Sequence, residues 1–287
     1  MKGIMSIQSH FVFSHSGNNS AVFPMQRMGA EVWPIHIGQY SNHTHYDQKI
    51  AGHHYAAGDI LELVTGVDNI GQLDRCAAVV SGHIGTIEQS NAIADVVTLV
   101  KQKNSQALYI SHPMIELDNK KKPIITPSTT KIIRDLSDIA DALVIGRDEL
   151  SLLVEMSIST LEDAISACQK VMDKGPKFIL LKNFPGFDDL NSTMMLSTPK
   201  ACYLAHRPYV HFDKPVVGID EIITGLFTAG LVKGMSPFLA FEHANNAAYG
   251  VLKITEELDG WELDIIRAQN EFIEPSYHFH PMKVASS

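Results

Sequence analysis

Short apolar runs alternate with longer amphipathic stretches along the sequence, and this alternation constrains the fold more than any other feature. The apolar runs have the length of buried strands, and the stretches between them have the length and spacing of helices. Strands separated by helices predict a mostly parallel sheet covered on both faces, with functional loops at the carboxyl ends of the strands. The predicted strands are residues 3–9, 31–37, 77–81, 107–111, 142–145 and 177–182, and the clearest helices are residues 20–28, 88–103 and 160–174.

The C-terminal third of the chain continues in a related pattern. Residues 194–208 are predicted to be rich in strands, and residues 218–233, 236–252 and 263–272 are predicted to form helices. No repeat, low-complexity stretch or linker interrupts the sequence, so a single domain over residues 1–287 is predicted.

Composition excludes several classes of protein. A hydrophobic content of 45% in 287 residues is enough for a large core. The net charge of −9 argues against a nucleic-acid partner, and the lysines at 120–122 are interpreted as a solvated turn. Three widely spaced cysteines without a CxxC motif indicate no disulfide framework and no zinc ribbon. No apolar run reaches the roughly 18 residues that span a bilayer, so we expect a cytoplasmic protein without a membrane partner.

Residues 39–57 differ from the rest of the chain, because they are rich in His, Tyr, Asn and Gly and show no clean periodicity. A polar segment of this length inside a compact domain usually lines a site or forms a lid. Its histidines have no spacing typical of a metal site, so we interpret them as surface or lid residues.

A long N-terminal block, IQSHFVFSHSGNNSAVFPMQRMGAEVWPI followed by QYSNHTHY, resembles the bacterial pyridoxal kinases, in particular those of the PdxY type. The resemblance continues through VSGHIGT at 80–86, FILLK at 178–182 and ITGLF at 223–227, and covers essentially the whole chain. It implies a ribokinase-like three-layer α/β/α fold and a homodimer. It also implies ATP and Mg²⁺ as cosubstrates, and the 5′-hydroxyl of pyridoxal or a related B6 vitamer as the acceptor.

The resemblance assigns a vitamer pocket to residues from the first half of the chain. It implies that Ser9 and Thr44 hydrogen-bond the pyridine ring and its substituents and that His43 lines the same pocket. Gly82 would let the backbone come close to the ligand, where a Cβ would intrude. His83 stands where the family commonly has a tyrosine.

The catalytic motif departs from the family pattern. Pyridoxal kinases carry a GxGD motif that opens a helix, and the corresponding stretch here is VVGIDEIITG at 216–225. With Gly218 and Gly225 aligned, Asp220 replaces the second motif glycine and Glu221 replaces the aspartate base. Asp220 would place a negative charge where phosphate should bind. Sliding the register by one residue makes Asp220 the base, but both motif glycines are then lost.

The nucleotide side of the site is also altered. The resemblance places Lys182, Thr224 and Gly225 near the nucleotide. The aspartate that the family holds near the cation is His112 here, while Glu149 is retained as a candidate ligand that reaches the cation through water.

Three functions remain open at this point. The first is a pyridoxal-kinase-like phosphotransferase, slowed by these substitutions, with Glu221 as the base. The second is a catalytically impaired pseudokinase that binds a B6 vitamer as a carrier, a sensor or the partner of a true kinase. The third is a related kinase for another small hydroxymethyl acceptor, such as a pyrimidine.

Overall fold

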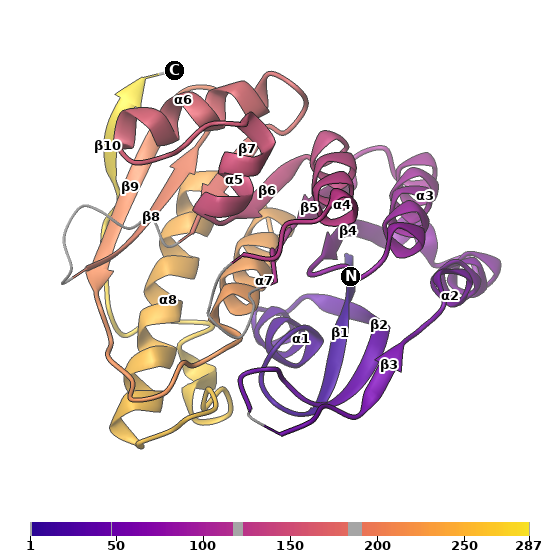
Figure 1. Cartoon of the computed structure of the whole chain (residues 1–287), viewed down its shortest axis with the longest axis horizontal. Coiled ribbons are helices and arrows are strands. Elements are labelled where there is room, and N and C mark those ends of the chain that lie inside the picture. The colour runs from indigo at the N-terminus through magenta and orange to yellow at the C-terminus, as the bar shows by residue number, and fades with distance from the viewer. Residues whose placement is uncertain (1, 47, 117–122, 183–190, 287) are drawn as a thin grey trace.

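The computed structural model describes residues 2–46, 48–116, 123–182 and 191–286, and its strands join one ten-stranded sheet. The strand order is β10-β9-β8-β7-β6-β5-β4-β1-β2-β3 (Figure 1). Neighbouring strands from β2 to β7 are parallel, whereas β3 at one edge and β8, β9 and β10 at the other edge pair in antiparallel fashion. The prediction of a mostly parallel sheet is confirmed.

The strands are β1 (Gly3–Phe13), β2 (Glu31–Asn42), β3 (Gly52–His54), β4 (Cys76–Ser81), β5 (Leu108–Ser111), β6 (Ala142–Ile145), β7 (Phe178–Leu181), β8 (Asn191–Ser197), β9 (Ala201–Pro208) and β10 (Met282–Ser286). The α-helices are α1 (Asn18–Arg27), α2 (Ala57–Asn69), α3 (Ile87–Lys103), α4 (Pro127–Asp138), α5 (Arg147–Val154), α6 (Leu161–Met172), α7 (Ile219–Val232) and α8 (Pro237–Glu257). Two 3₁₀ turns, η1 (Leu73–Arg75) and η2 (Arg267–Asn270), complete the described elements.

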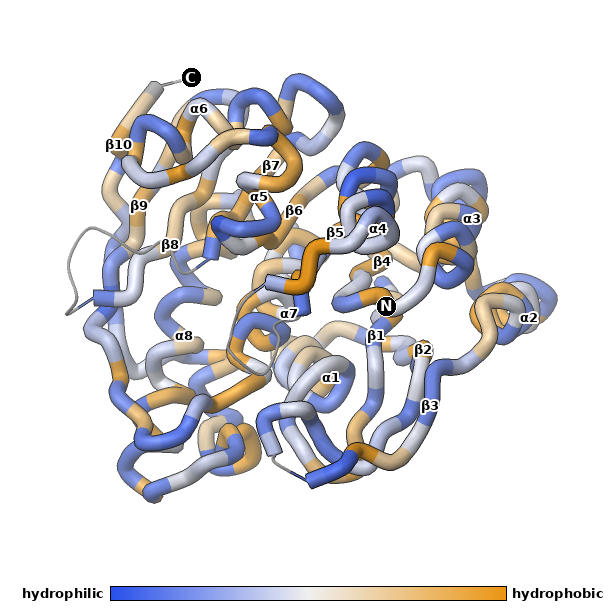
Figure 2. Tube along the Cα trace, in the orientation of Figure 1, coloured by the Kyte–Doolittle hydropathy of each residue, from blue (hydrophilic) through white to orange (hydrophobic). Residues whose placement is uncertain are grey.

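Helices cover both faces of the sheet, because side chains of a buried strand alternate between its two faces. In β1, Met5 and Ile7 belong to the core shared with α2 to α6, while Ile4 belongs to the core shared with α1, α7 and α8. Figure 2 shows hydrophobic residues concentrated along the central strands and on α7. The α7 helix packs against both α1 and α8. This arrangement is the predicted three-layer α/β/α architecture.

The order of strands in the sheet changes direction between β1 and β4. From β1 it first proceeds outward to β2 and β3, and it then returns to β4 on the other side of β1. Ligands of open α/β sheets bind outside the carboxyl ends of the strands at such a switch point. The loops that follow β1 and β4 are therefore the place to look for a site.

Two sequence predictions require correction. Strands β1 and β2 run four and five residues beyond their predicted ends, so β1 ends at Phe13 and β2 at Asn42. The polar segment therefore starts as a strand and returns as β3, which pairs with residues 38–40. The predicted helix at 263–272 is wrong, because only the 3₁₀ turn η2 forms there. The lysines at 120–122 lie outside the described residues.

Candidate active site

Two helix N-termini meet beside the carboxyl end of β1. Gly17 is the N-cap of α1 with φ 59°, and Gly218 is the N-cap of α7 with φ 98°. A Cβ on Gly17 would lie 2.4 Å from the Ser9 carbonyl oxygen, and one on Gly218 would lie 1.6 Å from the His15 carbonyl oxygen. Only glycine fits either position, since a side chain would meet backbone in a conformation that L-residues already disfavour.

Glu221 lies where these two helices meet, and its side chain is buried. Its Oε1 accepts hydrogen bonds from the Ser16 hydroxyl (3.0 Å) and from the Gly17 backbone N–H (3.1 Å). Burial raises the pKa of Glu221, and the neighbouring charge of Asp220 adds to the shift. A carboxylate with a raised pKa is a stronger base than an exposed one, so the position suits a proton acceptor.

Asp220, half-buried in the first turn of α7, forms an ionic cluster with two buried residues that follow strands β7 and β5. Its Oδ2 accepts from Nζ of Lys182 at 2.8 Å, and that same Nζ lies 2.6 Å from Nε2 of His112. Burial acts to raise the pKa of Asp220, but Lys182, His112 and Arg207 outweigh it and hold that pKa below its usual value. Burial and Lys182 hold the pKa of His112 well below 6.5, so this imidazole is neutral at pH 7. His112, predicted near the cation, thus contacts Lys182 through Nε2.

The residues predicted for the vitamer pocket lie around the ends of β1, β2 and β4. Ser9 lies at a β-bulge, where one residue of β1 faces two of β2 between the Gln8–His36 and His10–Gln39 pairs. Bulges of this kind often re-aim side chains beside active sites. Gly82 follows β4, and a Cβ there would lie 2.6 Å from Oε1 of Gln8. A side chain at residue 82 would therefore force the Gln8 side chain to move.

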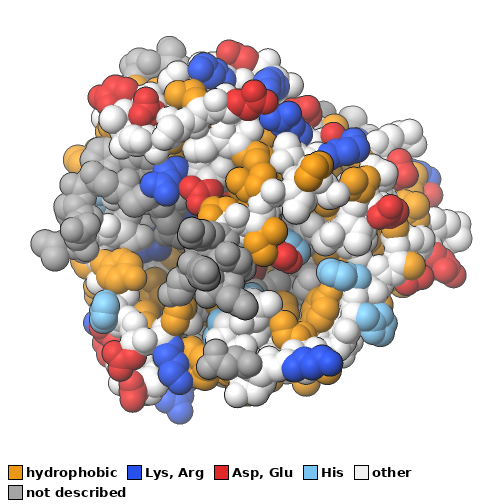
Figure 3. Space-filling view, in the orientation of Figure 1, with side chains coloured by type: hydrophobic (Ala, Val, Ile, Leu, Met, Phe, Trp, Pro, Cys, Tyr) orange, Lys and Arg blue, Asp and Glu red, His pale blue; other side chains and the backbone are white. Residues whose placement is uncertain are grey.

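The segment after β2, residues 43–46 and 48–54, is called the flap below. His43 packs edge-on against Phe11, and burial lowers its pKa to about 4. Thr44 is exposed at the tip of the flap. At the base of the flap, a Cβ on Gly85 would lie 2.5 Å from the His54 ring. Figure 3 shows a hollow on this face of the molecule, with histidine side chains gathered near β3.

His83 lies between the flap and the loop after β5. Its Nε2 is 3.2 Å from Oε1 of Glu116, and the hydrogen bond from His83 lowers the pKa of Glu116. Both residues line a cavity of about 220 Å³ that continues towards Ile132 and Leu136 of α4.

The remaining predicted residues are less centrally placed. Glu149 in α5 accepts from the Ile115 backbone N–H at 2.8 Å. The hydroxyl of Thr224 donates to the Asp220 carbonyl one helical turn earlier, and Gly225 packs against α1 at Ala21. Among the described residues, no group of three or more His, Cys, Asp or Glu side chains could hold a metal ion alone.

Comparison with known proteins decides the family. No protein-family model matches the chain. A curated relative named pyridoxal kinase PdxY from Vibrio campbellii is 48% identical over 279 residues, which cover 97% of this chain and 96% of the relative. Another of the same name, from Paraburkholderia xenovorans, is 37% identical over 284 residues, covering 97% of this chain and 96% of that relative. The chain belongs to the pyridoxal kinase PdxY family.

A solved structure supports the fold of this PdxY-family chain independently. Pyridoxal kinase from Leishmania donovani in complex with ADP and pyridoxamine superposes with a TM-score of 0.90, covering 99% of this chain and 100% of that one. Its sequence identity is 22%, so the likeness establishes the ribokinase-like fold. Among the described residues, no helix of the PdxY-family chain combines the length and hydrophobicity needed to cross a membrane.

Sequence reasoning missed several residues that shape this PdxY-family site. Ser16 binds the candidate base, while Tyr46 and Glu262 join the flap to the C-terminal part of the chain. Ser16 and Tyr46 stand inside the two N-terminal blocks that carry the resemblance, so those blocks could have pointed to them. Nothing in the sequence around Glu262 forms a recognisable motif, and only the fold brings it to the site.

Proposed function

We propose that this protein transfers the γ-phosphoryl group of ATP to the 5′-hydroxyl of pyridoxal or a related B6 vitamer. The observation that carries the proposal is the placement of Glu221, buried where α1 and α7 meet and close to the Lys182–Asp220 pair. A base is needed there to take the proton of the attacking hydroxyl, and a cation is needed near the phosphates. The near-full-length identity to curated pyridoxal kinases supports the same reaction.

The chemistry divides between two groups of this chain. Glu221, with its raised pKa, would accept the proton of the vitamer hydroxyl as that oxygen attacks phosphorus. Lys182 and the N-terminal turn of α7 would face the negative charge of the phosphates. The comparisons give no support to a pseudokinase, and the relatives' shared name favours pyridoxal over a pyrimidine acceptor.

We also propose a divalent cation, Mg²⁺, as a cosubstrate bound with the nucleotide. Mg²⁺ prefers oxygen ligands and usually takes one or two carboxylates together with substrate phosphates and waters. Glu149 fits as a nearby carboxylate, although its Oε1 already accepts from the Ile115 N–H. Assembly as a homodimer and a cytoplasmic location are proposed on the family resemblance.

Substitution of Glu221 tests the proposal directly. Formation of the phosphorylated vitamer should fall by about a hundredfold or more in Glu221→Gln, because general base catalysis contributes roughly 10²–10⁴ in rate. Glutamine keeps an acceptor for Ser16 and Gly17, so the loop should stay in place. The exposed Glu274 provides the matched control, and Glu274→Gln should keep wild-type turnover.

The assay should run with pyridoxal, pyridoxine, pyridoxamine and a hydroxymethylpyrimidine as acceptors. Turnover of the pyrimidine alone would overturn the acceptor assignment. Binding of pyridoxal without any turnover by the wild-type chain would overturn the kinase assignment. Unchanged turnover in Glu221→Gln would remove Glu221 from the role of base.

A further inference from the structure

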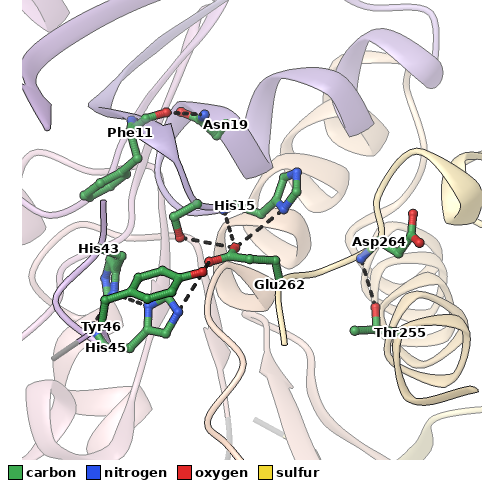
Figure 4. Close-up of polar contacts among 10 residues, drawn as sticks. Phe11, His15, Asn19, His43, His45, Tyr46, Thr255, Glu262 and Asp264 are labelled. Atoms are coloured by element: carbon green, nitrogen blue, oxygen red, sulfur yellow. Dashed lines mark hydrogen bonds and ion pairs between the residues drawn. The ribbon is translucent and has the colours of Figure 1, made fainter. Parts of the chain in front are cut away.

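Glu262 brings a carboxylate from the C-terminal part of the chain to the N-terminal site. It lies in the loop between α8 and η2, and its side chain is 15% exposed. The neighbouring Leu263 and Ile265 are buried in the core, and the Asp264 N–H donates to Oγ1 of Thr255 in α8 at 3.1 Å (Figure 4). These contacts fix the loop against α8, so Glu262 stands on a rigid support.

One oxygen of Glu262 holds the loop between β1 and α1. Oε2 accepts from the His15 backbone N–H at 2.7 Å and from the Ser14 hydroxyl at 3.3 Å (Figure 4). Nδ1 of His15 lies 3.5 Å from the same oxygen.

The other oxygen holds the tip of the flap. Oε1 accepts from the Tyr46 hydroxyl at 2.8 Å and lies 3.3 Å from Nε2 of His45 (Figure 4). The adjacent Trp261 packs on both rings, with centroid distances of 4.6 Å to Tyr46 and 5.3 Å to His45. Nζ of Lys214, in the segment that leads into α7, lies 4.0 Å from the centre of the Trp261 ring.

The loop held by Glu262 is the loop that holds the candidate base. Residues 14 and 15 bind Glu262, and the next two residues, Ser16 and Gly17, bind Glu221. Four consecutive residues thus lie between two carboxylates, one from each side. A shift of the loop towards or away from Glu262 must therefore move the partners of Glu221. Misplacement of a catalytic group by about 1 Å can cost roughly a hundredfold in rate.

We propose that Glu262 is a positioning residue that sets the flap and the Glu221-binding loop relative to one another. The proposal rests on the function proposed above, because it gives Glu262 an effect on turnover through Glu221. Several hydrogen bonds, of which the backbone bond to His15 is the shortest, hold the pKa of Glu262 at about 2 against the effect of burial. The carboxylate is therefore charged, and able to accept on both sides, throughout the physiological pH range.

Three variants distinguish the contacts that Glu262 makes with the flap from those that it makes with the loop between β1 and α1. Tyr46→Phe removes one flap contact and leaves the loop contacts, so KM for pyridoxal should rise about tenfold while kcat stays within about twofold. Glu262→Ala removes both sides, so KM should rise and kcat should fall by roughly tenfold to a hundredfold. Glu262→Gln keeps the size of the side chain and one acceptor, and should lie between wild type and Glu262→Ala. Glu274→Ala is the matched control and should behave as wild type.

Hydrogen exchange gives a readout that does not need turnover. In Glu262→Ala, exchange should accelerate both in residues 14–17 and in the flap, whereas Tyr46→Phe should accelerate it in the flap alone. Equal kinetics in wild type and Glu262→Ala, or a fall in thermal stability with no change in kcat or KM, would overturn the inference. If the wild-type chain has no kinase activity, the proposed function fails, and the exchange pattern alone then decides whether Glu262 joins the two segments.

Discussion

Asp220 places a carboxylate in the first turn of α7, where a helix N-terminus attracts anions. Its partner Lys182 is almost fully buried, so the ion pair is shielded from solvent on the lysine side. If phosphate binds where the proposed function places it, it has to compete with Asp220 both for the positive end of the helix and for the lysine. The sequence analysis predicted this repulsion, and the structure adds the ion pair that now occupies Lys182.

Removal of the Asp220 charge should therefore strengthen nucleotide binding and weaken folding. In Asp220→Asn, the affinity for an ATP analogue with Mg²⁺, measured by calorimetry, should rise about tenfold, equivalent to about 1.4 kcal/mol. The unliganded protein should lose about 3 kcal/mol in the free energy of unfolding, since Lys182 would be left buried without its anionic partner.

An exposed ion pair provides the control for this substitution. Asp135 pairs with Lys131 on the surface of α4 at 2.6 Å, so Asp135→Asn should change neither quantity by more than a few tenths of a kcal/mol. Unchanged or weaker nucleotide affinity in Asp220→Asn would show that Asp220 does not compete with phosphate.

Motif comparison could name single residues as candidates but could not predict their contacts. It identified Asp220 and Glu221 as the substituted motif positions, and the structure places both at the start of α7. The contact between Lys182 and His112 joins residues 70 positions apart, so it depends on the order of strands in the sheet. The same limit applies to Glu262, which has no motif and lies more than 200 residues from its partners in the chain.

At the scale of elements, helices with a strong apolar periodicity were predicted correctly, and those with a weak one were not. Helix α3 begins one residue before its predicted start and ends where predicted, because its apolar face is long and regular. Helices α2, α4 and α5 were missed; α2 begins at the last residue of the polar segment, and α5 is only eight residues long. Residues 263–272 have the apolar spacing of a helix, but Leu263, Ala268 and Phe272 are buried in the core around α8 without forming one. There, tertiary packing overrides local pattern.

The N-cap of α7 allows a prediction at the scale of a single element. Gly218→Ala should destabilise the protein by well over the roughly 1–2 kcal/mol that a left-handed conformation costs an L-residue, because the new Cβ would also overlap the His15 carbonyl. Gly234 has a similar φ of 89°, and a Cβ added there would have no atom within 4 Å, so Gly234→Ala should show the conformational cost alone. Chemical denaturation measures both variants. Equal losses would mean that the α1 and α7 termini are not tightly packed.

At the scale of the whole molecule, the first and last parts of the chain build one site. The loop after β1 leads into α1 and binds Glu221 of α7, and the loop after α8 reaches the flap through Glu262. Contributions from such distant segments make the site sensitive to global stability, since any loosening of α8 also frees Glu262. The charge state of the buried histidines should therefore affect the fold and the site together.

Acid should destabilise this protein from below pH 6.5, before ordinary carboxylates titrate. Burial lowers the pKa of His43 to about 4 and that of His112 well below 6.5, while the unfolded chain binds protons at each near pH 6.5. The unfolded state thus gains protons that the folded state lacks, so the free energy of unfolding falls as pH drops from 6.5 towards 4. Glu262, with its pKa of about 2, lowers the free energy of unfolding further as the pH drops below 4.5.

Urea denaturation at pH 7.5, 6.0 and 5.0 would measure the fall in the free energy of unfolding. Substitution of His43 would show how much of the fall comes from this residue. His43→Asn removes a group that binds a proton only on unfolding, so the slope of unfolding free energy against pH should flatten by up to about 1.4 kcal/mol per pH unit between 6.5 and 4. Gln102→Asn, which replaces one exposed and non-titrating side chain with another, should leave the slope unchanged. A wild-type slope in His43→Asn would mean that His43 takes up its proton in the folded protein, and that the flap is open to solvent below neutral pH.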